Sequence, residues 1–581
     1  MRALSARLLP HLARYRRGLA WGLACVALSN LIGLAQPQVL RLAVDDLYRG
    51  VTAEKLGRYA LILFGIGLVA GAFRFAMRKA VIGISRKIEF DLRNELFAHL
   101  QKLPLEYYQR TRTGEIMSRA TNDLGAVRMM LGPGLMYLVN TAVVSAVSIG
   151  FMLAISPRIT LYSLLPLPFV TLAAWFFGER IHHRFEEIQA HFAAISARVQ
   201  ESLAGVRVVR AFTRESRELE EFEVVNREYL DKNVRLIQTS GLFHPSLTFL
   251  AGLAALLALY LGGREVVKGR ITLGEFVAFT VYLASLNWPM VALGWVISLF
   301  QRGAASFGRI LEILDQEPGI VSPPAALAPA RSRGEIEFRD LDFTYPGAAR
   351  PALSGVSFAV PAGRTVALVG RTGAGKSTLL SLLPRLFDPP AGRVLLDGAD
   401  VRDYDLAWLR SQIAWAPQET FLFSATVADN IAYGVERAEP EEVERAARVA
   451  HLDGDVRGFP DGYATMVGER GITLSGGQKQ RTAIARAVLR DAPVLLLDDC
   501  LSSVDTHTEE AILQGLRGEM RRRTTLIVSH RVSTVRDADL ILVLEEGAIV
   551  ERGTHDELLG HGGRYAALWR EQQLEEEIEA S

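Results

Sequence analysis

The segment Gly370–Thr378 has the residue types and spacing of a loop that binds phosphate groups. Glycines let backbone N–H groups approach phosphate oxygens, Lys376 would reach the β and γ phosphates of a nucleotide, and the Ser377 hydroxyl would ligate Mg²⁺. An apolar strand pattern precedes the segment and a helical pattern follows it, which disfavours a glycine-rich turn without function. The residues are Gly370, Arg371, Thr372, Gly373, Ala374, Gly375, Lys376, Ser377 and Thr378.

A second apolar strand pattern ends in carboxylates. Val494–Leu497 is followed by Asp498, which would hold Mg²⁺ through water. Alone this signal is weak, because buried strands often end in aspartate. Together with the phosphate loop, it predicts a site for a nucleotide and Mg²⁺.

Short β-branched runs alternate with helical patterns around these motifs. Such alternation predicts an α/β domain with a largely parallel sheet, and therefore places both motifs at strand ends. The expected strands are Thr365–Val369, Arg393–Leu396, Ile413–Ala416, Val494–Leu497, Thr525–Val528 and Leu540–Leu544.

Six long apolar stretches occupy the first 300 residues. Most approach or exceed the roughly 20 residues that a helix needs to cross a hydrocarbon core about 30 Å thick. An even number puts both ends on one side, and the arginines before the first stretch put that side in the cytosol. A cleaved signal peptide is the alternative for the first stretch, but no small-residue cleavage site follows it. The stretches lie near residues 19–40, 59–84, 131–156, 159–178, 242–263 and 271–300.

The two inner connections, roughly 85–130 and 179–240, are long, charged and helical in pattern. Residues 185–235 look like one continuous amphipathic helix. Because such segments are too polar for a bilayer, we expect the membrane helices to continue far into the cytosol.

The two halves of the chain carry opposite net charge. Residues 1–310 hold 36 Lys and Arg against 22 Asp and Glu, a net of +14, and residues 311–581 hold 29 against 42, a net of −13. A basic half joined to an acidic half indicates two different environments. The two cysteines, Cys25 and Cys500, exclude a disulfide framework and a Cys-based zinc site.

A proline-containing segment, Ile320–Arg333, separates the two halves and disfavours a helix there. The chain is therefore expected to be multidomain. We expect an all-α transmembrane domain of six spanning helices over residues 1–315, a linker over 316–333 and an α/β P-loop nucleotide-binding domain over 334–581.

A pentapeptide that heads a helix lies between the phosphate loop and Asp498: Leu474, Ser475, Gly476, Gly477 and Gln478. The ordered set of motifs resembles the ATP-binding cassette (ABC) transporters, whose signature loop has this sequence. The resemblance covers the whole chain, and six spans before one cassette look like a bacterial half-transporter of the exporter type (type I/IV). The stretches Arg112–Asp123 and Gln200–Arg207 are most similar to multidrug-resistance-like heterodimeric exporters.

The resemblance implies roles for single residues. Tyr345 matches the aromatic residue that stacks on adenine, Gln418 the glutamine that senses Mg²⁺, and His530 the switch histidine on the γ-phosphate. Glu469 matches the exporter segment that links the signature loop to the inner connections, and Asp505 matches the loop that crosses the dimer interface. The implied Mg²⁺ ligands are Ser377, Gln418 and Asp498.

In this family two cassettes close head to tail around two ATP molecules. Each site pairs one chain's phosphate loop with the other chain's signature loop, and closure pulls on the inner ends of the membrane helices. The segments near Thr113–Leu124 and Ser202–Arg214 are the candidates for the helices that transmit this pull, with solvated surface helices as the alternative. The resemblance also implies a bacterial cytoplasmic membrane, with both termini and the cassette in the cytosol.

One position departs from the family pattern. The residue after Asp498 is a glutamate in the family, the general base that activates the attacking water, whereas here it is Asp499. A carboxylate withdrawn by about 1 Å costs about 10²-fold in a positioned reaction, and aspartate is also a slightly weaker base. We therefore expect catalytic residues Asp499 and His530, with ATP and Mg²⁺ bound but slow hydrolysis. A water or backbone shift that restores the reach is the alternative.

Because the signature loop is intact while the base is shortened, we expect a non-identical half-transporter as the partner rather than a second copy. The expected activity is export of amphipathic drugs, lipids or peptides, and a mainly regulatory subunit is the alternative. Arg74, Arg78 and Lys79 interrupt the second apolar stretch and would either face a cavity or extend to lipid headgroups. The apolar stretches and the acidic cassette argue against nucleic acid as a partner.

Overall fold

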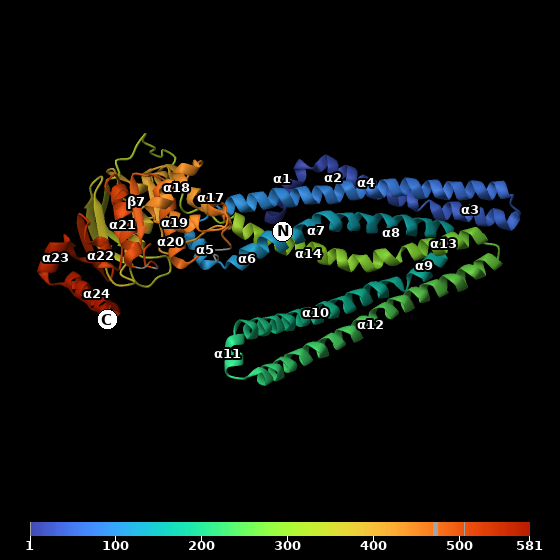
Figure 1. Cartoon of the computed structure of the whole chain (residues 1–581). Coiled ribbons are helices and arrows are strands. Elements are labelled where there is room, and N and C mark those ends of the chain that lie inside the picture. Colours follow the sequence, from blue (N-terminus) through green and yellow to red (C-terminus); the bar gives the residue numbers. More distant parts are fainter. Residues whose placement is uncertain (1, 469–473, 503, 505, 581) are drawn as a thin grey trace. The chain divides into compact units, whose positions relative to one another are not determined.

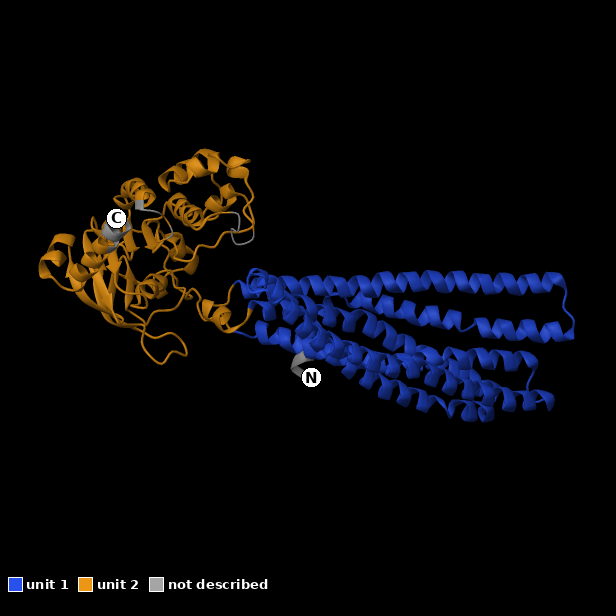
Figure 2. Cartoon of the chain, turned by 60° about the horizontal axis from the view of Figure 1, so that its bottom comes forward, with its two compact units in different colours: residues 1–101, 113–316 blue, residues 102–112, 317–581 orange. Residues whose placement is uncertain are grey.

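Figure 1 shows the computed structural model, which describes residues 2–468, 474–502, 504 and 506–580. The chain divides into two compact units, coloured in Figure 2. Unit 1 comprises residues 1–101 and 113–316, and unit 2 comprises residues 102–112 and 317–581. Residues 102–112 thus group with unit 2 although they lie within the first 315 residues.

Unit 1 consists of helices, and six of its helical segments among the described residues are long and apolar enough to cross a membrane. This confirms the expected number of spans. The 48 residues of α4 (Ala53–Leu100) extend about 72 Å at 1.5 Å per residue, more than twice the thickness of a hydrocarbon core. The segments are Arg16–Arg49, Ala53–Leu100, Thr113–Ile155, Pro157–Ala204, Glu215–Val267 and Leu273–Leu314.

Three of these segments are interrupted by one or two residues. A proline lies at the start of the helix after two of the breaks, where its missing N–H costs no hydrogen bond. At the first break the carbonyl of Leu34 accepts a hydrogen bond of 2.9 Å from the Tyr282 hydroxyl, which is fully buried. The interrupted pairs are α2 (Arg16–Gly33) and α3 (Gln36–Arg49), α9 (Pro157–Leu164) and α10 (Leu167–Ala204), and α13 (Leu273–Ser285) and α14 (Asn287–Leu314).

The segment Thr113–Ile155 contains α6 (Thr113–Ser118), α7 (Leu124–Met129) and α8 (Leu135–Ile155), joined by wider helical turns. Its first part packs within unit 1, because Asp123 forms an ion pair with Arg309 of α14. The part of the first inner connection that groups with unit 2 is instead residues 102–112, which contain α5 (Leu105–Arg110). The candidate coupling segment Thr113–Leu124 therefore lies in unit 1, directly after the stretch that contains α5.

The prediction of one continuous helix over residues 185–235 is wrong. α10 ends at Ala204, a short α11 (Val206–Ala211) follows, and α12 begins at Glu215 and continues to Val267 (Figure 1). Thr213 has a φ of 52°, which turns the chain between α11 and α12. The amphipathic spacing continues on both sides of these breaks, so the pattern alone does not reveal them. α11 lies within the second candidate coupling segment, Ser202–Arg214.

The described residues of unit 2 form two sheets. The larger has the strand order β10-β9-β3-β8-β7-β6, in which β10 is antiparallel and the other pairs are parallel; the smaller, antiparallel sheet has the order β2-β1-β4-β5. All six expected strands are present within one residue of their predicted ends. The strands are β1 (Ile336–Phe343), β2 (Leu353–Val360), β3 (Thr365–Val369), β4 (Val394–Leu396), β5 (Ala399–Asp400), β6 (Ile413–Ala416), β7 (Val494–Asp498), β8 (Thr524–Val528), β9 (Leu540–Glu545) and β10 (Ala548–Gly553).

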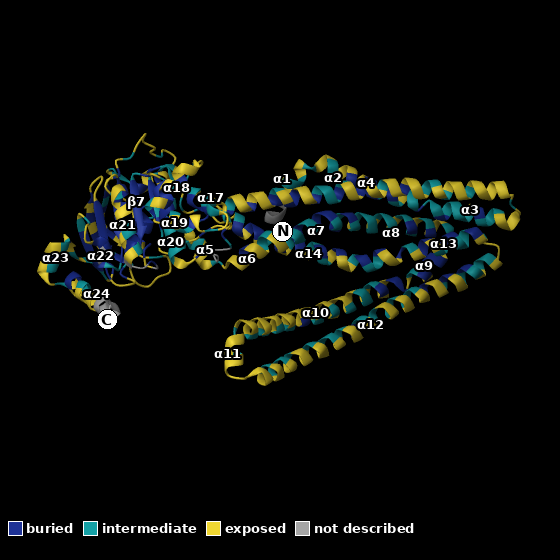
Figure 3. Ribbon diagram, viewed as in Figure 1, coloured by how far each residue is buried: buried dark blue, intermediate teal, exposed yellow. Residues whose placement is uncertain are grey.

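The central strands of the larger sheet, β3, β7 and β8, are buried along their whole length, as the colour of β7 in Figure 3 shows. Alternate residues of β3 enter different apolar clusters, with Ala367 and Val369 in one and Val366 and Leu368 in the other. This explains the unbroken apolar run of β3, which is typical of parallel strands covered on both faces. The helices of unit 2 besides α5 are α15 (Lys376–Leu382), α16 (Leu406–Ser411), α17 (Val427–Ala432), α18 (Pro440–Val449), α19 (Asp453–Arg457), α20 (Gly476–Leu489), α21 (Thr506–Met520), α22 (Val532–Val535), α23 (His555–His561) and α24 (Arg564–Ala580).

The expected linker forms no helix, as its prolines predict. It is held against unit 2 near its middle, where the Leu327 backbone N–H donates to the carbonyl of Asp403 at 2.8 Å.

Candidate nucleotide site

The phosphate loop joins the end of β3 to the start of α15. Two of its glycines leave no room for a side chain. A Cβ at Gly370 would lie 2.2 Å from the carbonyl oxygen of Leu544, and one at Gly375, whose φ is 96°, would lie 2.6 Å from that of Ala352. The loop is therefore packed closely against neighbouring backbone, and glycine is required there by space as well as by conformation.

The Lys376 side chain folds back over this loop and is buried. Its Nζ donates hydrogen bonds to the carbonyl oxygens of Gly370 at 2.6 Å and Arg371 at 2.9 Å. Burial lowers the pKa of Lys376, while the charges of Asp499 and Asp498 act in the opposite direction. An amine held in this position can exchange its carbonyl partners for phosphate oxygens at the mouth of the loop.

Ser377 and Asp498 lie side by side. The Ser377 hydroxyl donates to Asp498 Oδ1 at 2.9 Å, and burial raises the pKa of Asp498. A hydroxyl and a carboxylate are the hard oxygen ligands that Mg²⁺ takes together with phosphate oxygens. The two residues therefore fit a magnesium ion bound with a nucleotide, and the exposed side chain of Gln418 could supply a further oxygen.

Asp499 lies beside Gln418 and His530, to which the resemblance gives roles at the Mg²⁺ ion and at the γ-phosphate. Its Oδ2 is 3.4 Å from Gln418 Nε2 and 3.8 Å from His530 Nε2. Asp499 has a φ of 44°, a left-handed conformation that aspartate tolerates better than most residues, and its backbone N–H donates to the carbonyl of Val528 at 3.0 Å. Burial raises the pKa of Asp499 and lowers the pKa of His530. The carboxylate and imidazole thus form one small, poorly solvated pair at the ends of β7 and β8.

Tyr345 lies on the other side of the phosphate loop. Its hydroxyl is 3.0 Å from the Thr378 hydroxyl, and its ring makes edge-on contacts with Phe343 and Phe387. These contacts fix a half-buried aromatic ring beside the loop, which suits a stacking role. The structure thus brings together Tyr345, the phosphate loop, Gln418, Asp498, Asp499 and His530 in unit 2.

Two family models match the chain. The ABC transporter transmembrane region matches residues 19–290, and the ABC transporter domain matches residues 353–502. The probable multidrug resistance ABC transporter ATP-binding/permease protein YheI of Bacillus subtilis (strain 168) is 39% identical over 551 residues, covering 94% of this chain and 93% of that protein. The chain belongs to the ABC transporters.

Other relatives cover the chain equally well. The multidrug resistance-like ATP-binding protein MdlA of Escherichia coli (strain K12) is 38% identical over 97% of this chain and 96% of its own length. The ATP-dependent lipid A-core flippase of Vibrio vulnificus (strain CMCP6) is 34% identical over 97% of both chains. A solved structure of a bacterial Atm1-family ABC exporter with ATP bound is similar with a TM-score of 0.79 and 32% identity, covering 96% of this chain and 99% of that one. These matches identify the protein as an ABC exporter half-transporter with a transmembrane domain and one cassette.

In this ABC cassette the signature residues Leu474–Gln478 form the start of α20. The Ser475 hydroxyl accepts from the Gln478 backbone N–H at 3.2 Å, and Gln478 Oε1 accepts from the Ser475 backbone N–H at 3.0 Å. This reciprocal cap satisfies two N–H groups of the first turn. Leu474 is buried, while Gly476 and Gly477 begin the helix. Glu469 and Asp505, the predicted interface residues, lie outside the described residues.

The sequence motifs did not reveal Glu509, an acidic residue that holds the loop carrying His530. This loop, residues 529–531, is called the switch loop below. Glu509 of α21 is buried, and its carboxylate accepts hydrogen bonds from the Arg531 guanidinium and the Thr534 hydroxyl. The sequence feature that could have revealed Glu509 is its position on the apolar face of α21, three residues before the buried Ile512 and seven before the buried Leu516. A carboxylate on such a face requires a buried partner.

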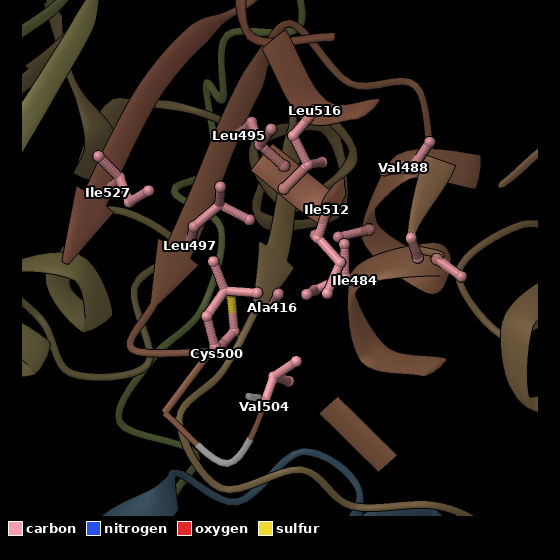
Figure 4. Packing of buried hydrophobic residues seen from close by; sticks show 14 of the residues in the cluster. Ala416, Ile484, Val488, Leu495, Leu497, Cys500, Val504, Ile512, Leu516 and Ile527 are labelled. Carbon is pink, nitrogen blue, oxygen red and sulfur yellow. The ribbon is translucent and has the colours of Figure 1, made fainter. Parts of the chain in front are cut away.

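Cys500, next to the predicted base, is a core residue. Figure 4 shows its sulfur among apolar side chains, including Leu497 and Val504. Burial raises the pKa of the Cys500 thiol to about 12, so the thiolate is not formed at neutral pH. The thiol therefore packs the floor of the site and does no chemistry there.

Proposed function

We propose that this chain is the subunit of an ATP-driven exporter whose own ATP site is slow. The observation that carries the proposal is Asp499, a shortened and buried carboxylate at the position of the catalytic base, beside a phosphate loop that matches its motif. The membrane and cassette domains are proposed to be residues 1–315 and 334–581, joined by the linker 316–333.

The proposed roles follow the positions of the side chains. Tyr345 stacks on adenine, the loop Gly370–Thr378 wraps the phosphates, and Lys376 neutralises the β and γ phosphates. Ser377, Gln418 and Asp498 hold Mg²⁺, which neutralises charge on the phosphate oxygens when it is bound. Asp499 orients the attacking water, and His530 contacts the γ-phosphate.

Slow hydrolysis follows from the reach of Asp499. Its carboxylate is held beside Gln418 and His530 by a backbone fixed on Val528, so a shift that would restore the missing methylene meets resistance. A carboxylate misplaced by about 1 Å costs about 10²-fold. Binding of ATP does not depend on this carboxylate, because the phosphate loop binds the phosphates of the nucleotide.

A partner chain is supported by unit 1. The parts of α10 and α12 beyond their apolar membrane stretches expose large apolar side chains. Much of the ribbon of both helices has the colour of exposed residues in Figure 3. Exposed apolar surface of this extent marks an interaction site. We propose that a second half-transporter covers it and that the intact signature loop Leu474–Gln478 completes the ATP site of that partner. The residues are Phe185, Phe192, Leu203, Leu219, Val224, Leu230 and Ile237, each at least 49% exposed.

The proposed cargo is amphipathic or apolar: a drug, a lipid or a peptide. The relatives named for multidrug resistance and for lipid A-core flipping support this class. An apolar cavity of about 640 Å³ in unit 1, formed by residues of α8, α9, α10 and α14 that include Leu164, Trp175 and Met290, is compatible with it. The proposed location is the cytoplasmic membrane of a bacterium, with the cassette in the cytosol.

A mainly regulatory subunit is the second candidate, and Asp499 is the observation that favours it. In that case ATP binding at this site would gate a partner that performs most of the hydrolysis. The two candidates differ in whether transport requires hydrolysis at this site.

The test is transport by the chain, alone and together with a second, non-identical ABC half-transporter, reconstituted in liposomes with a fluorescent amphipathic dye or a fluorescent phospholipid. We expect ATP-dependent transport that Lys376→Ala abolishes. Retained transport in Asp499→Asn, with loss in Lys376→Ala, favours the regulatory subunit. Transport in the absence of ATP, or unchanged transport in Lys376→Ala, contradicts both candidates.

A further inference from the structure

The loop between β8 and α22 carries His530, and its position decides where the imidazole lies. The ring itself is half-exposed, and its contact with Asp499 is a long 3.8 Å. The backbone N–H of His530 hydrogen-bonds to the Asp499 carboxylate. These contacts hold the imidazole and the backbone N–H of His530. The backbone carbonyl of His530 is bound by another part of the chain.

That other part is Gln572, on the last helix α24. Gln572 Oε1 accepts a hydrogen bond from the backbone N–H of Val532 at 2.8 Å, and Gln572 Nε2 donates to the backbone carbonyl of His530. One side-chain amide therefore bridges two backbone groups on either side of Arg531. Only an amide has a donor and an acceptor side by side, and the two backbone groups fix which atom faces which.

The helix that carries Gln572 is itself firmly attached to the cassette. Tyr565 is fully buried in the apolar core, and Leu568 and Trp569 pack against the same core. The Glu551 carboxylate accepts from the backbone N–H groups of Arg564 and Tyr565, which caps the first turn of α24. Gln572 is thus presented from a fixed helix, as a positioning group needs to be.

We infer that Gln572 is a positioning residue that holds the switch loop so that the His530 imidazole faces the γ-phosphate. It acts through the backbone of His530 and does not touch the nucleotide. The inference rests on the proposed role of His530 in hydrolysis, and it adds the last helix of the chain to the parts that set the rate.

The chain offers a matched control, because Gln573 is the same residue type at the next position and is exposed. The variants are Gln572→Ala, which removes both hydrogen bonds, Gln572→Glu, which keeps the acceptor but loses the donor, and Gln573→Ala. All three are made in the full-length Asp499→Glu chain, where the expected faster hydrolysis gives a measurable rate. Melting temperatures verify that each variant is folded.

We expect Gln572→Ala and Gln572→Glu to lower kcat for ATP hydrolysis about tenfold, with KM changed less than about twofold, because a positioning group acts on the reacting geometry rather than on binding. Gln573→Ala should match its parent. Hydrogen exchange of the Val532 amide should be faster in Gln572→Ala but stay slow in Gln572→Glu, which retains the acceptor.

Several results would overturn the inference: unchanged kcat in Gln572→Ala, a rise in KM alone, or equal effects of Gln572→Ala and Gln573→Ala. If the unmodified chain already hydrolyses ATP rapidly, the slow-site proposal fails, and the same comparison is made in the unmodified chain. If neither background hydrolyses ATP, hydrogen exchange decides: unaltered exchange at Val532 in Gln572→Ala contradicts the inference, and faster exchange confined to the switch loop supports it.

Discussion

Lengthening the carboxylate at one position should accelerate ATP hydrolysis by this chain. The substitution Asp499→Glu adds a methylene to a side chain that ends 3.8 Å from His530 Nε2 and 3.4 Å from Gln418 Nε2. The new carboxylate would extend further into the space where the attacking water is proposed to lie. Glutamate tolerates the φ of 44° at this position less well than aspartate, so a small loss of thermal stability should accompany the change.

The size of the expected rate increase is set by the position of the carboxylate rather than by its basicity. An offset of about 1 Å corresponds to about 10²-fold in a positioned reaction. The intrinsic pKa of glutamate exceeds that of aspartate by only about 0.4 units, which accounts for less than threefold. Because the surrounding loop takes up part of the added length, we expect turnover to rise between about tenfold and about a hundredfold.

The assay is steady-state phosphate release by the purified full-length chain in lipid nanodiscs, with nucleotide binding measured in parallel. Asp498→Glu is the matched control, since it adds the same methylene one residue earlier. In Asp498→Glu the added methylene disturbs the 2.9 Å hydrogen bond from the Ser377 hydroxyl, which should lower turnover. Rapid hydrolysis by the unmodified chain that Asp499→Glu leaves unchanged would refute the reasoning, as would a parallel response of the two variants.

Of three further predictions, two concern the cassette and the third concerns one cysteine in each unit. Ser475→Ala removes the cap of α20 and should lower the free energy of unfolding by about 1 kcal/mol, measured by thermal or chemical denaturation; an unaltered transition would show that the cap contributes nothing. Burial lowers the pKa of His530 below 6.5, so the unfolded chain binds more protons as the pH falls and folded stability is lost. The melting temperature should therefore fall more between about pH 7.5 and about pH 5.5 in the unmodified chain than in His530→Gln, and an equal fall would contradict this. Cys25 and Cys500 are both buried, so a maleimide reagent should label neither in the folded protein and both after denaturation, as mass spectrometry would show; labelling of Cys500 in the folded state would contradict its place in the core.

The fold could be predicted well where the pattern was unambiguous. Strands such as β3 and β7 are short apolar runs between a turn and a motif, and the structure has them within one residue. Strands β1, β2, β5 and β10 were missed. In β1 and β2, polar residues such as Glu337, Arg339 and Ser357 lie between the buried ones. The break after Ala204 was missed for a different reason: local backbone conformation at Gly205 and Thr213 ends the helix, while the amphipathic spacing continues.

The residues of the nucleotide site could be predicted where they belong to a sequence motif that has a single chemical role. Lys376, Ser377 and Asp498 belong to a motif whose spacing is set by the phosphates. Glu509 and Gln572 carry no such motif, because each acts on a loop that only the folded chain brings near it. These contacts join residues far apart in the sequence, 22 residues between Glu509 and Arg531 and 40 residues between Gln572 and Val532. They depend on tertiary packing, which spacing along the chain does not encode.

The hairpin of α10 and α12 has a consequence for the cell. A chain made without its partner would leave the exposed apolar side chains of this hairpin uncovered. Proteases and chaperones in the cytosol recognise such surfaces. Under the proposed pairing with a non-identical half-transporter, its abundance should then follow the supply of that partner, and loss of either gene should deplete both proteins.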